Sequence, residues 1–290
     1  MEMMTVRNAI DMHIHSYPCL FPRIADDRGI AEAAAGAGLG AIVLKCHHES
    51  TVSRAHALDG VYGGLRVFGG IVLNGHVGGL NPAAVESALR LGGKIVWMPT
   101  TDAAYHSTVY GSRGRYDVQE SGQDQSVDGG ITVLGPDSRL LPRVVDIVAL
   151  IAQYGAVLAT SHLSPQEAAV LVPEARRMGV ERVVVTHPFF KVPAYTLDQL
   201  RHLVEQGAFA EFGYCTVSPM WAYVKLDQIV QAIRALGPER CTLVSDGGQR
   251  HNPMPHESLR VFMQCLNEKG VPVDQLRMMV EANPRKLLDI

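Results

Sequence analysis

This sequence of 290 residues has little net charge and lacks the features that mark several common classes of protein. Its formal charge at pH 7 is only −3, so it offers no broad basic surface for nucleic acid. No apolar run is long enough to cross a membrane. The first residues, MEMMTVRNAI, lack the charged-then-apolar pattern of a signal peptide. We therefore expect a cytoplasmic protein with neither a nucleic-acid nor a membrane partner.

The chain also lacks paired cysteines. Its five cysteines are scattered, odd in number, and form no Cys-x-x-Cys pair. They are Cys19, Cys46, Cys215, Cys241 and Cys265. Such a distribution is typical of reduced thiols rather than of a disulfide framework. We interpret Cys19, Cys46 and Cys215 as small buried hydrophobic residues.

What the chain does have is a regular alternation of two hydrophobic patterns. Short β-branched runs are followed by Ala- and Leu-rich stretches of helical character, several of which end in Gly. The expected strands cover residues 8–15, 41–47, 66–74, 94–100, 156–162, 182–188, 208–213 and 241–246. This repeat predicts an α/β protein, a (β/α)8 TIM barrel formed by residues 1–290 as a single domain. An open doubly wound sheet is the alternative, but no Gly-x-Gly-x-x-Gly loop follows the first strand.

One connection interrupts this repeat. After the fourth expected strand, residues 101–138 are rich in Gly, Ser, Asp and Tyr and end in a pattern typical of a small hairpin. Long loops inside a compact domain are usually functional or disordered. Because this one follows a strand, it lies on the face where barrel active sites are found. We expect it to form a lid.

The histidines are concentrated where the expected strands end. The strand-end residues are His13 and His15, His47 and His48, His162, His187 and Asp246. His13 and His15 point to the same side of their strand, so they can share a metal ion, although two polar residues can also simply end a strand. Zinc accepts imidazole nitrogen and carboxylate oxygen, and a catalytic site leaves one position open for water. Asp246 is the natural candidate for the base that takes the proton of that water.

This arrangement resembles the amidohydrolase superfamily of metal-dependent barrels, from His13 to the terminal NPRKLLDI. The phrases LKCHHEST, GGLNPAAVESAL, VWMPT and TSHLSPQE are similar to a poorly characterised group of amidohydrolase-related proteins. The resemblance implies that His13 and His15 are metal ligands, that His162 and His187 bind metal or polarise a carbonyl, and that Asp246 is both ligand and base. The ion would be zinc, or else Mn, Fe or Co, with one or two ions per chain.

The sequence also departs from that family. Many members carry a Lys or Glu at the end of the fourth strand to bridge two metals, whereas this strand ends Trp97-Met98-Pro99-Thr100. The site therefore holds either one metal or an unusual pair completed by Lys45, His47 or His48. Lys45 is also a candidate catalytic group, or else a structural partner of Glu211. His47 is favoured over His48 as a ligand because it shares the side of Lys45.

Four further residues are candidates for substrate binding. They are Arg23, His48, Asn74 and Tyr105, which lie in or near the loops that follow the expected strands. Arg23 can hold a carboxylate or remain solvated, and Tyr105 belongs to the inner surface expected for the lid.

The sequence predicts a metal-dependent hydrolase that cleaves an amide, cyclic amide, lactone or ester bond of a small polar molecule. A decarboxylase or hydratase on the same barrel is the first alternative. A phosphoesterase and a metal-binding barrel without catalysis are the others. The small-molecule substrate is the partner we expect, and the sequence leaves open whether the chain forms a homo-oligomer.

Overall fold

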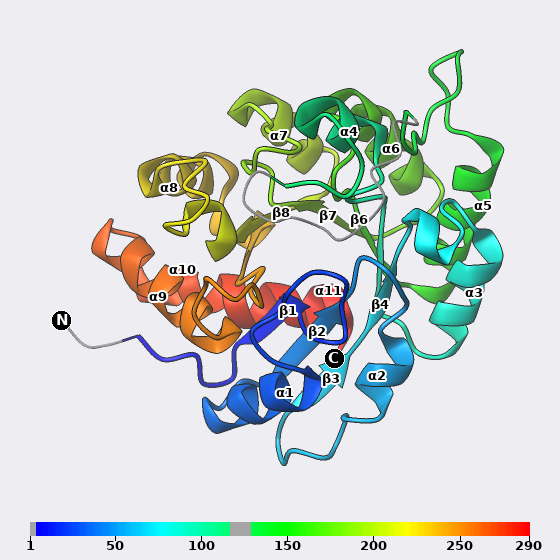
Figure 1. The fold of residues 1–290 in the computed structure, drawn as a ribbon. Helices are drawn as coiled ribbons and strands as arrows, with labels where there is room; N and C mark the ends of the chain where they lie inside the picture. The colour runs from blue at the N-terminus through cyan, green and yellow to red at the C-terminus, as the bar shows by residue number, and fades with distance from the viewer. Residues whose placement is uncertain (1–3, 117–128) are drawn as a thin grey trace.

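The computed structural model describes residues 4–116 and 129–290, in which short strands alternate with helices that surround them (Figure 1). The strands are β1 (Ile10–His15), β2 (Ala41–Lys45), β3 (Arg66–Phe68), β4 (Gly70–Val72), β5 (Ile95–Trp97), β6 (Val157–Ala159), β7 (Arg182–Thr186), β8 (Phe209–Gly213) and β9 (Cys241–Val244). The longer helices are α1 (Asp27–Gly36), α3 (Pro82–Arg90), α5 (Pro142–Tyr154), α6 (Pro165–Arg177), α7 (Leu197–Glu205), α8 (Leu226–Leu236) and α9 (Pro255–Glu268). The shorter ones are α2 (Val52–His56), α4 (Ala104–Tyr110), α10 (Val273–Arg277) and α11 (Asn283–Leu288), with 3-10 turns at Gly75–Val77, Tyr214–Val217 and Pro238–Arg240 and a π-helical turn at Met278–Ala282.

The strands run parallel and close into a ring. Strands β1 to β3 form one sheet and β4 to β9 another, in chain order. The two sheets meet where β1 lies beside the end of β9, because the His15 amide donates to the Gly247 carbonyl over 2.8 Å. Parallel strands joined by helices in this order are the architecture that the sequence predicted.

Strands β3 and β4 are two halves of one predicted strand, interrupted at Gly69. The side chain of Thr51 causes this interruption. Its hydroxyl donates to the Leu44 carbonyl at 2.7 Å and accepts from the Gly70 amide at 3.0 Å. A Cβ on Gly69 would lie 2.6 Å from the Thr51 backbone, and one on Gly70 would collide with the Ile95 carbonyl oxygen. Both positions therefore require glycine.

Replacing Gly70 by Ala should lower the free energy of unfolding by about 1–3 kcal/mol, the usual range for forced overpacking. The backbone of β5 cannot move away without breaking its ladder with β6. Gly63→Ala is the matched control, because no atom lies within 4 Å of the added methyl group. Urea unfolding of both variants measures the difference. Equal urea midpoints for Gly70→Ala and Gly63→Ala would show that the close approach of Gly70 to β5 does not require glycine.

Two layers of apolar side chains hold the barrel. One layer fills the ring and includes Ile10, Met12, Val43, Trp97 and Val184. Leu287 and Leu288 of α11 belong to the same cluster, so the C-terminal helix closes the amino-terminal end of the ring. The other layer packs the outer faces of the strands against the helices. The open end of the ring is therefore the carboxyl end of the strands.

The predicted lid is described only in part. Residues 104–110 form α4, and an antiparallel bridge joins Leu134 to Leu140 in the region where a hairpin was expected. The middle of the insertion, residues 117–128, lies outside the described residues, so the lid remains a prediction. Across the described ranges, no helix has both the length and the apolar character needed to span a membrane.

Candidate metal centre

A β-bulge in β1 places both of its histidines inside the ring. Asp11 pairs with Ile42 of β2 and Ile14 pairs with Leu44, so β1 contains one extra residue between these positions. Before the bulge Ile10 and Met12 face the interior, whereas after it Ile14 joins the outer layer. His13 and His15 consequently face the cavity at the open end of the ring. Bulges commonly redirect side chains beside active sites.

Asp246 lies against both of these histidines. Its Oδ1 is 3.1 Å from His13 Nε2 and 3.3 Å from His15 Nε2. Donor atoms bound to one tetrahedral zinc ion about 2.0 Å away would be separated by about 3.3 Å. His13, His15 and Asp246 are all buried, and their ligand atoms form a group that can hold one metal ion.

His162 and His187 reach the same cavity through strained backbone. Ser161 has a φ of 53° and His187 a φ of 27°, in the left-handed region that side chains other than glycine rarely adopt. The alternation of β6 and β7 would otherwise direct both imidazoles away from the ring. Their rings lie 5.1 Å apart, and His187 lies 5.9 Å from His13. Asp246 is in the same region, with a φ of 44°. Strain of this kind clusters at functional sites.

Two charged residues contact His13, Glu211 from behind the ring and Lys45 from the cavity side. Glu211 Oε1 is 2.9 Å from His13 Nδ1, and Lys45 Nζ is 2.9 Å from His13 Nε2. Because the ammonium of Lys45 donates, Nε2 must accept, so the proton of the neutral ring is on Nδ1 and faces Glu211. The lone pair of Nε2 faces the cavity, where Lys45 contacts it, so an ion bound to Nε2 would displace the Lys45 ammonium from this contact. A carboxylate that orients a histidine in this way is common behind metal ligands.

The cavity itself has a volume of about 30 Å³, enough for water or an ion. The histidines and Asp246 form one side, joined by Lys45, Arg23 and Gln249. The other side is largely aromatic and consists of Phe21, Tyr116, Phe190 and Trp221, with Cys215 beside them. Polar groups therefore converge on one side of a small apolar chamber.

Burial makes the imidazoles of this cavity neutral. It lowers the pKa of His13, His15, His47 and His162 well below the usual value and that of His187 to about 3. Burial acts in the opposite direction on the carboxyl groups, raising the pKa of Asp246 to about 6 and that of Glu211 to about 8. It lowers the pKa of Lys45 to about 8. Neutral imidazole is the form that binds metal.

These residues fit a divalent cation. His187 Nδ1 is buried, with no hydrogen-bond partner among the described residues. An orphaned imidazole nitrogen costs free energy unless something accepts or donates there. Two further imidazoles and a carboxylate nearby supply the hard and borderline donors that zinc and similar ions prefer.

The other predicted site residues fall into two groups. His47 and Arg23 line the cavity: His47 stacks on His15 at 4.7 Å, and Arg23 Nη2 lies 3.3 Å from His15 Nδ1. His48, Asn74 and Tyr105 are not among the residues that line it. His48 lies beyond the end of β2, in a bend, and its ring contacts Cys19 and Cys46 instead.

Asn74 has a structural role instead. Its amide donates to the His47 carbonyl and to the Thr100 and Thr101 hydroxyls, and its oxygen accepts from the Thr100 amide. No capacity is left for a substrate. Thr100 in turn contacts His47 Nδ1 at 2.8 Å. His47 is therefore oriented by the strand end at which the bridging Lys or Glu was missing.

Sequence reasoning did not identify four of the cavity residues, namely Phe21, Phe190, Trp221 and Gln249. It also did not pair His106 with His162, whose Nδ1 atoms lie 2.8 Å apart. The four cavity residues are in loops after strands, and His106 is in α4, which follows β5; a position after a strand is the only local signal that could have found them. Their packing against one another depends on loop conformation, which no hydrophobic period encodes.

Known proteins relate to this chain as follows. The model of a family described as a family of unknown function (DUF6282) matches residues 8–211. No protein in the curated collection searched matches the chain. Solved structures match it over almost its whole length at low identity.

Three of these structures are informative. An amidohydrolase from Pseudomonas aeruginosa is 14% identical, with a TM-score of 0.61, over 97% of this chain and 95% of the other. A putative 2-pyrone-4,6-dicarboxylic acid hydrolase from Pseudomonas putida is 16% identical, with a TM-score of 0.59, over 100% and 98% of the two chains. A 2,6-dihydroxybenzoate decarboxylase from Rhizobium is 12% identical, with a TM-score of 0.52, over 99% of each chain. At such identities the likeness establishes the fold, which is the one that the resemblance to amidohydrolases predicted.

Proposed function

The chain belongs to the DUF6282 family of unknown function, and from its site we propose that it is a metal-dependent hydrolase of a small polar substrate. The observation that carries this proposal is the buried group of His13, His15 and Asp246 at the open end of the barrel. Such a group is expensive to bury without a function, because each polar atom must be satisfied.

We assign the ion to His13, His15 and Asp246, with His187 or His162 as a further ligand. When bound, a divalent cation acts as a Lewis acid on water and on a carbonyl oxygen. Asp246 presents Oδ1 to the histidines, which leaves Oδ2 to accept the proton of a water molecule. A base whose pKa is near the working pH is the most effective, and that of Asp246 is raised to about 6.

The rest of the cavity indicates the class of substrate. Arg23 brings a guanidinium to within 3.3 Å of His15, where it can bind a substrate carboxylate. Four aromatic side chains form the opposite side and offer an apolar surface for the rest of the substrate. We propose a small, planar or cyclic acid with an amide, lactone or ester bond as the substrate.

Decarboxylation is the second candidate, because Arg23 beside a metal site can equally hold a carboxylate that is to be lost. A panel of cyclic amides, lactones and esters, set against β-keto and aromatic acids, separates the two reactions. Release of carbon dioxide without hydrolysis would replace the first proposal with the second.

Elemental analysis of protein purified without chelators tests the proposal directly. We expect at least one divalent ion per chain, and about one ion per chain fewer in the His13→Ala variant. A content near zero that cannot be restored by added zinc, manganese, iron or cobalt would exclude metal-dependent catalysis at this site.

Metal affinity should fall about tenfold for each pH unit below about 6, since binding must then displace one proton. The proton is that of Asp246, whose pKa burial raises from 3.8 to about 6. The imidazoles do not add to the slope in this range, because burial lowers their pKa values below it. Competition with a chromophoric chelator between pH 4.5 and 8 measures the slope. An affinity that stays constant down to pH 4.5 would contradict this assignment.

A further inference from the structure

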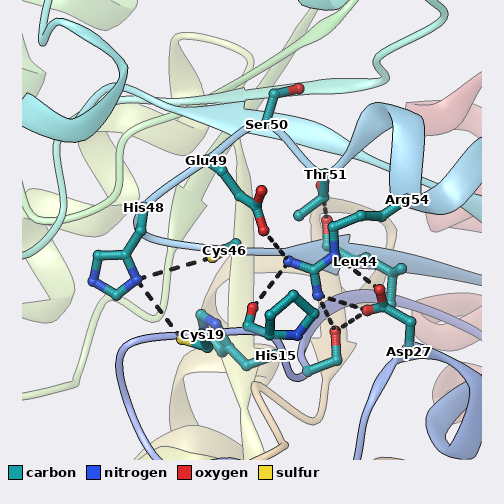
Figure 2. A network of polar contacts seen from close by, with 12 residues as sticks. His15, Cys19, Asp27, Leu44, Cys46, His48, Glu49, Ser50, Thr51 and Arg54 are labelled. Carbon is teal, nitrogen blue, oxygen red and sulfur yellow. Dashed lines mark hydrogen bonds and ion pairs between the residues drawn. The ribbon is translucent and has the colours of Figure 1, made fainter.

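Two cysteines and a histidine meet just outside the cavity. Cys19 is in the loop after β1, whereas Cys46 and His48 directly follow β2 (Figure 2). His48 Nδ1 is 3.8 Å from Cys19 Sγ and 3.9 Å from Cys46 Sγ. The ligand atoms of all three residues lie within 4.8 Å of one another. The sequence suggested only small buried hydrophobic residues at both cysteine positions.

The spacing of these atoms suits a shared ion better than hydrogen bonds. The nitrogen-to-sulfur distances of 3.8 and 3.9 Å are close to the upper limit for a hydrogen bond that involves sulfur. A tetrahedral zinc ion with bonds of about 2.3 Å to sulfur and 2.0 Å to nitrogen places these donors about 3.5 Å apart. Only a few tenths of an ångström therefore separate His48 Nδ1 from a coordinating distance to each sulfur.

The polar contacts of Arg54 hold the loop after β1 against the segment that follows β2. The guanidinium of Arg54 binds the Pro18 carbonyl at 3.1 Å and the Glu49 carboxylate at 2.6 Å, and it also pairs with Asp27 (Figure 2). Pro18 is next to Cys19, and Glu49 is next to His48. The two segments that carry the sulfur and nitrogen donors are thus fixed before any ion binds, which lowers the entropic cost of binding.

This cluster is separate from the His13 site. Lys45 and His47 line the cavity, whereas Cys46 and His48 do not, and His48 instead contacts the two sulfur atoms. The ring of Phe21 lies between the two sites, 5.6 Å from that of His47 and 5.5 Å from that of His48. Cys19 and His48 are half-buried, which leaves a path for an ion from solvent.

We propose that Cys19, Cys46 and His48 form a second metal site for a soft or borderline cation of the zinc class. Two thiolates and one imidazole favour such ions over magnesium or calcium. Water completes the coordination. An ion there ties the loop that carries Phe21 and Arg23 to the end of β2, and so fixes two residues of the cavity wall.

Cobalt substitution tests this proposal, because only thiolate ligands give an intense charge-transfer band in the near ultraviolet. We expect the band in wild-type protein titrated with Co²⁺ under reducing conditions, a fall to about half or less in Cys19→Ser, and its loss when Cys19 and Cys46 are both replaced by Ser. Cys265→Ser is the matched control for loss of a thiol elsewhere. Cys215→Ala is the control for the sulfur that lines the cavity. Both control variants should keep the band.

The outcome is independent of the hydrolase proposal. His13→Ala should remove metal from the cavity and leave the charge-transfer band unchanged. Cadmium NMR of the wild-type protein gives a second readout that needs no variant, since its chemical shift reports the number of thiolate ligands. The absence of a band and of a thiolate-bound cadmium signal would overturn the proposal. A band of wild-type intensity in the variant with both Cys19 and Cys46 replaced by Ser would also overturn it, as would a disulfide between Cys19 and Cys46 in the protein as isolated.

Discussion

Replacing Asp246 by Asn should lower kcat/KM by about 10²- to 10⁴-fold, the usual contribution of a positioned general base. The amide keeps the shape of the side chain, and its oxygen can still lie near His13 and His15. It cannot accept the proton of a water molecule. Turnover of the best substrate from the panel, measured with metal-loaded protein, gives the size of the effect.

Two controls separate this loss from loss of the fold or of the metal. Asp198→Asn changes a carboxylate that is 88% exposed and should leave turnover unchanged. The metal content of Asp246→Asn must be measured alongside its activity, because the carboxylate is also an expected ligand. Unaltered turnover in a fully loaded Asp246→Asn variant would remove Asp246 from the mechanism.

Much of the barrel could be predicted because its signals are local. Parallel strands buried on both faces appear as continuous apolar runs, and helices such as α5 end in a left-handed glycine, here Gly155. The positions of His13, His162, His187 and Asp246 at strand ends followed directly from those boundaries. Predicting that titratable groups gather at the open end of the barrel thus required only the regular alternation of strands and helices along the sequence.

The directions in which these side chains point were harder to predict from the sequence. Simple alternation puts His13 on the same side as Asp11, opposite to Ile10 and Met12, which fill the ring. The bulge that corrects this is braced by Asp11, whose carboxylate accepts from the amide of Ser245, 234 residues away in the chain. A contact between such distant residues leaves no local pattern. The same holds for the left-handed backbone at His187.

The residues around the cavity were the least predictable, because their roles depend on which hydrogen bonds are already used. Asn74 has the chemistry of a substrate-binding residue, yet its bonds to the strand ends consume its amide. His48 has the chemistry of a cavity residue, yet it faces two sulfur atoms. Composition can supply the candidates, but only the packing of loops decides between them.

Replacing Glu211 by Leu should weaken metal binding by about 10- to 100-fold, although Glu211 lies behind the cavity and does not line it. Its carboxylate is 2.9 Å from His13 Nδ1 and fixes the tautomer whose Nε2 lone pair faces the cavity. Without that partner the buried Nδ1 proton has no acceptor, and the ring can rotate or change tautomer. Chelator competition at pH 9, above the pKa of about 8 to which burial raises Glu211, measures the affinity with the carboxylate ionised.

Glu211→Gln separates the role of the hydrogen bond from that of the charge. An amide oxygen still accepts from His13 Nδ1, so the tautomer is kept, but the negative charge that makes the imidazole a stronger donor is lost. We expect an intermediate affinity, with the metal-free variant as stable as wild type in thermal unfolding. Equal metal affinity in wild type, Glu211→Gln and Glu211→Leu would mean that His13 is oriented by the bulge of β1 alone, and that Glu211 serves only as a counter-charge for Lys45.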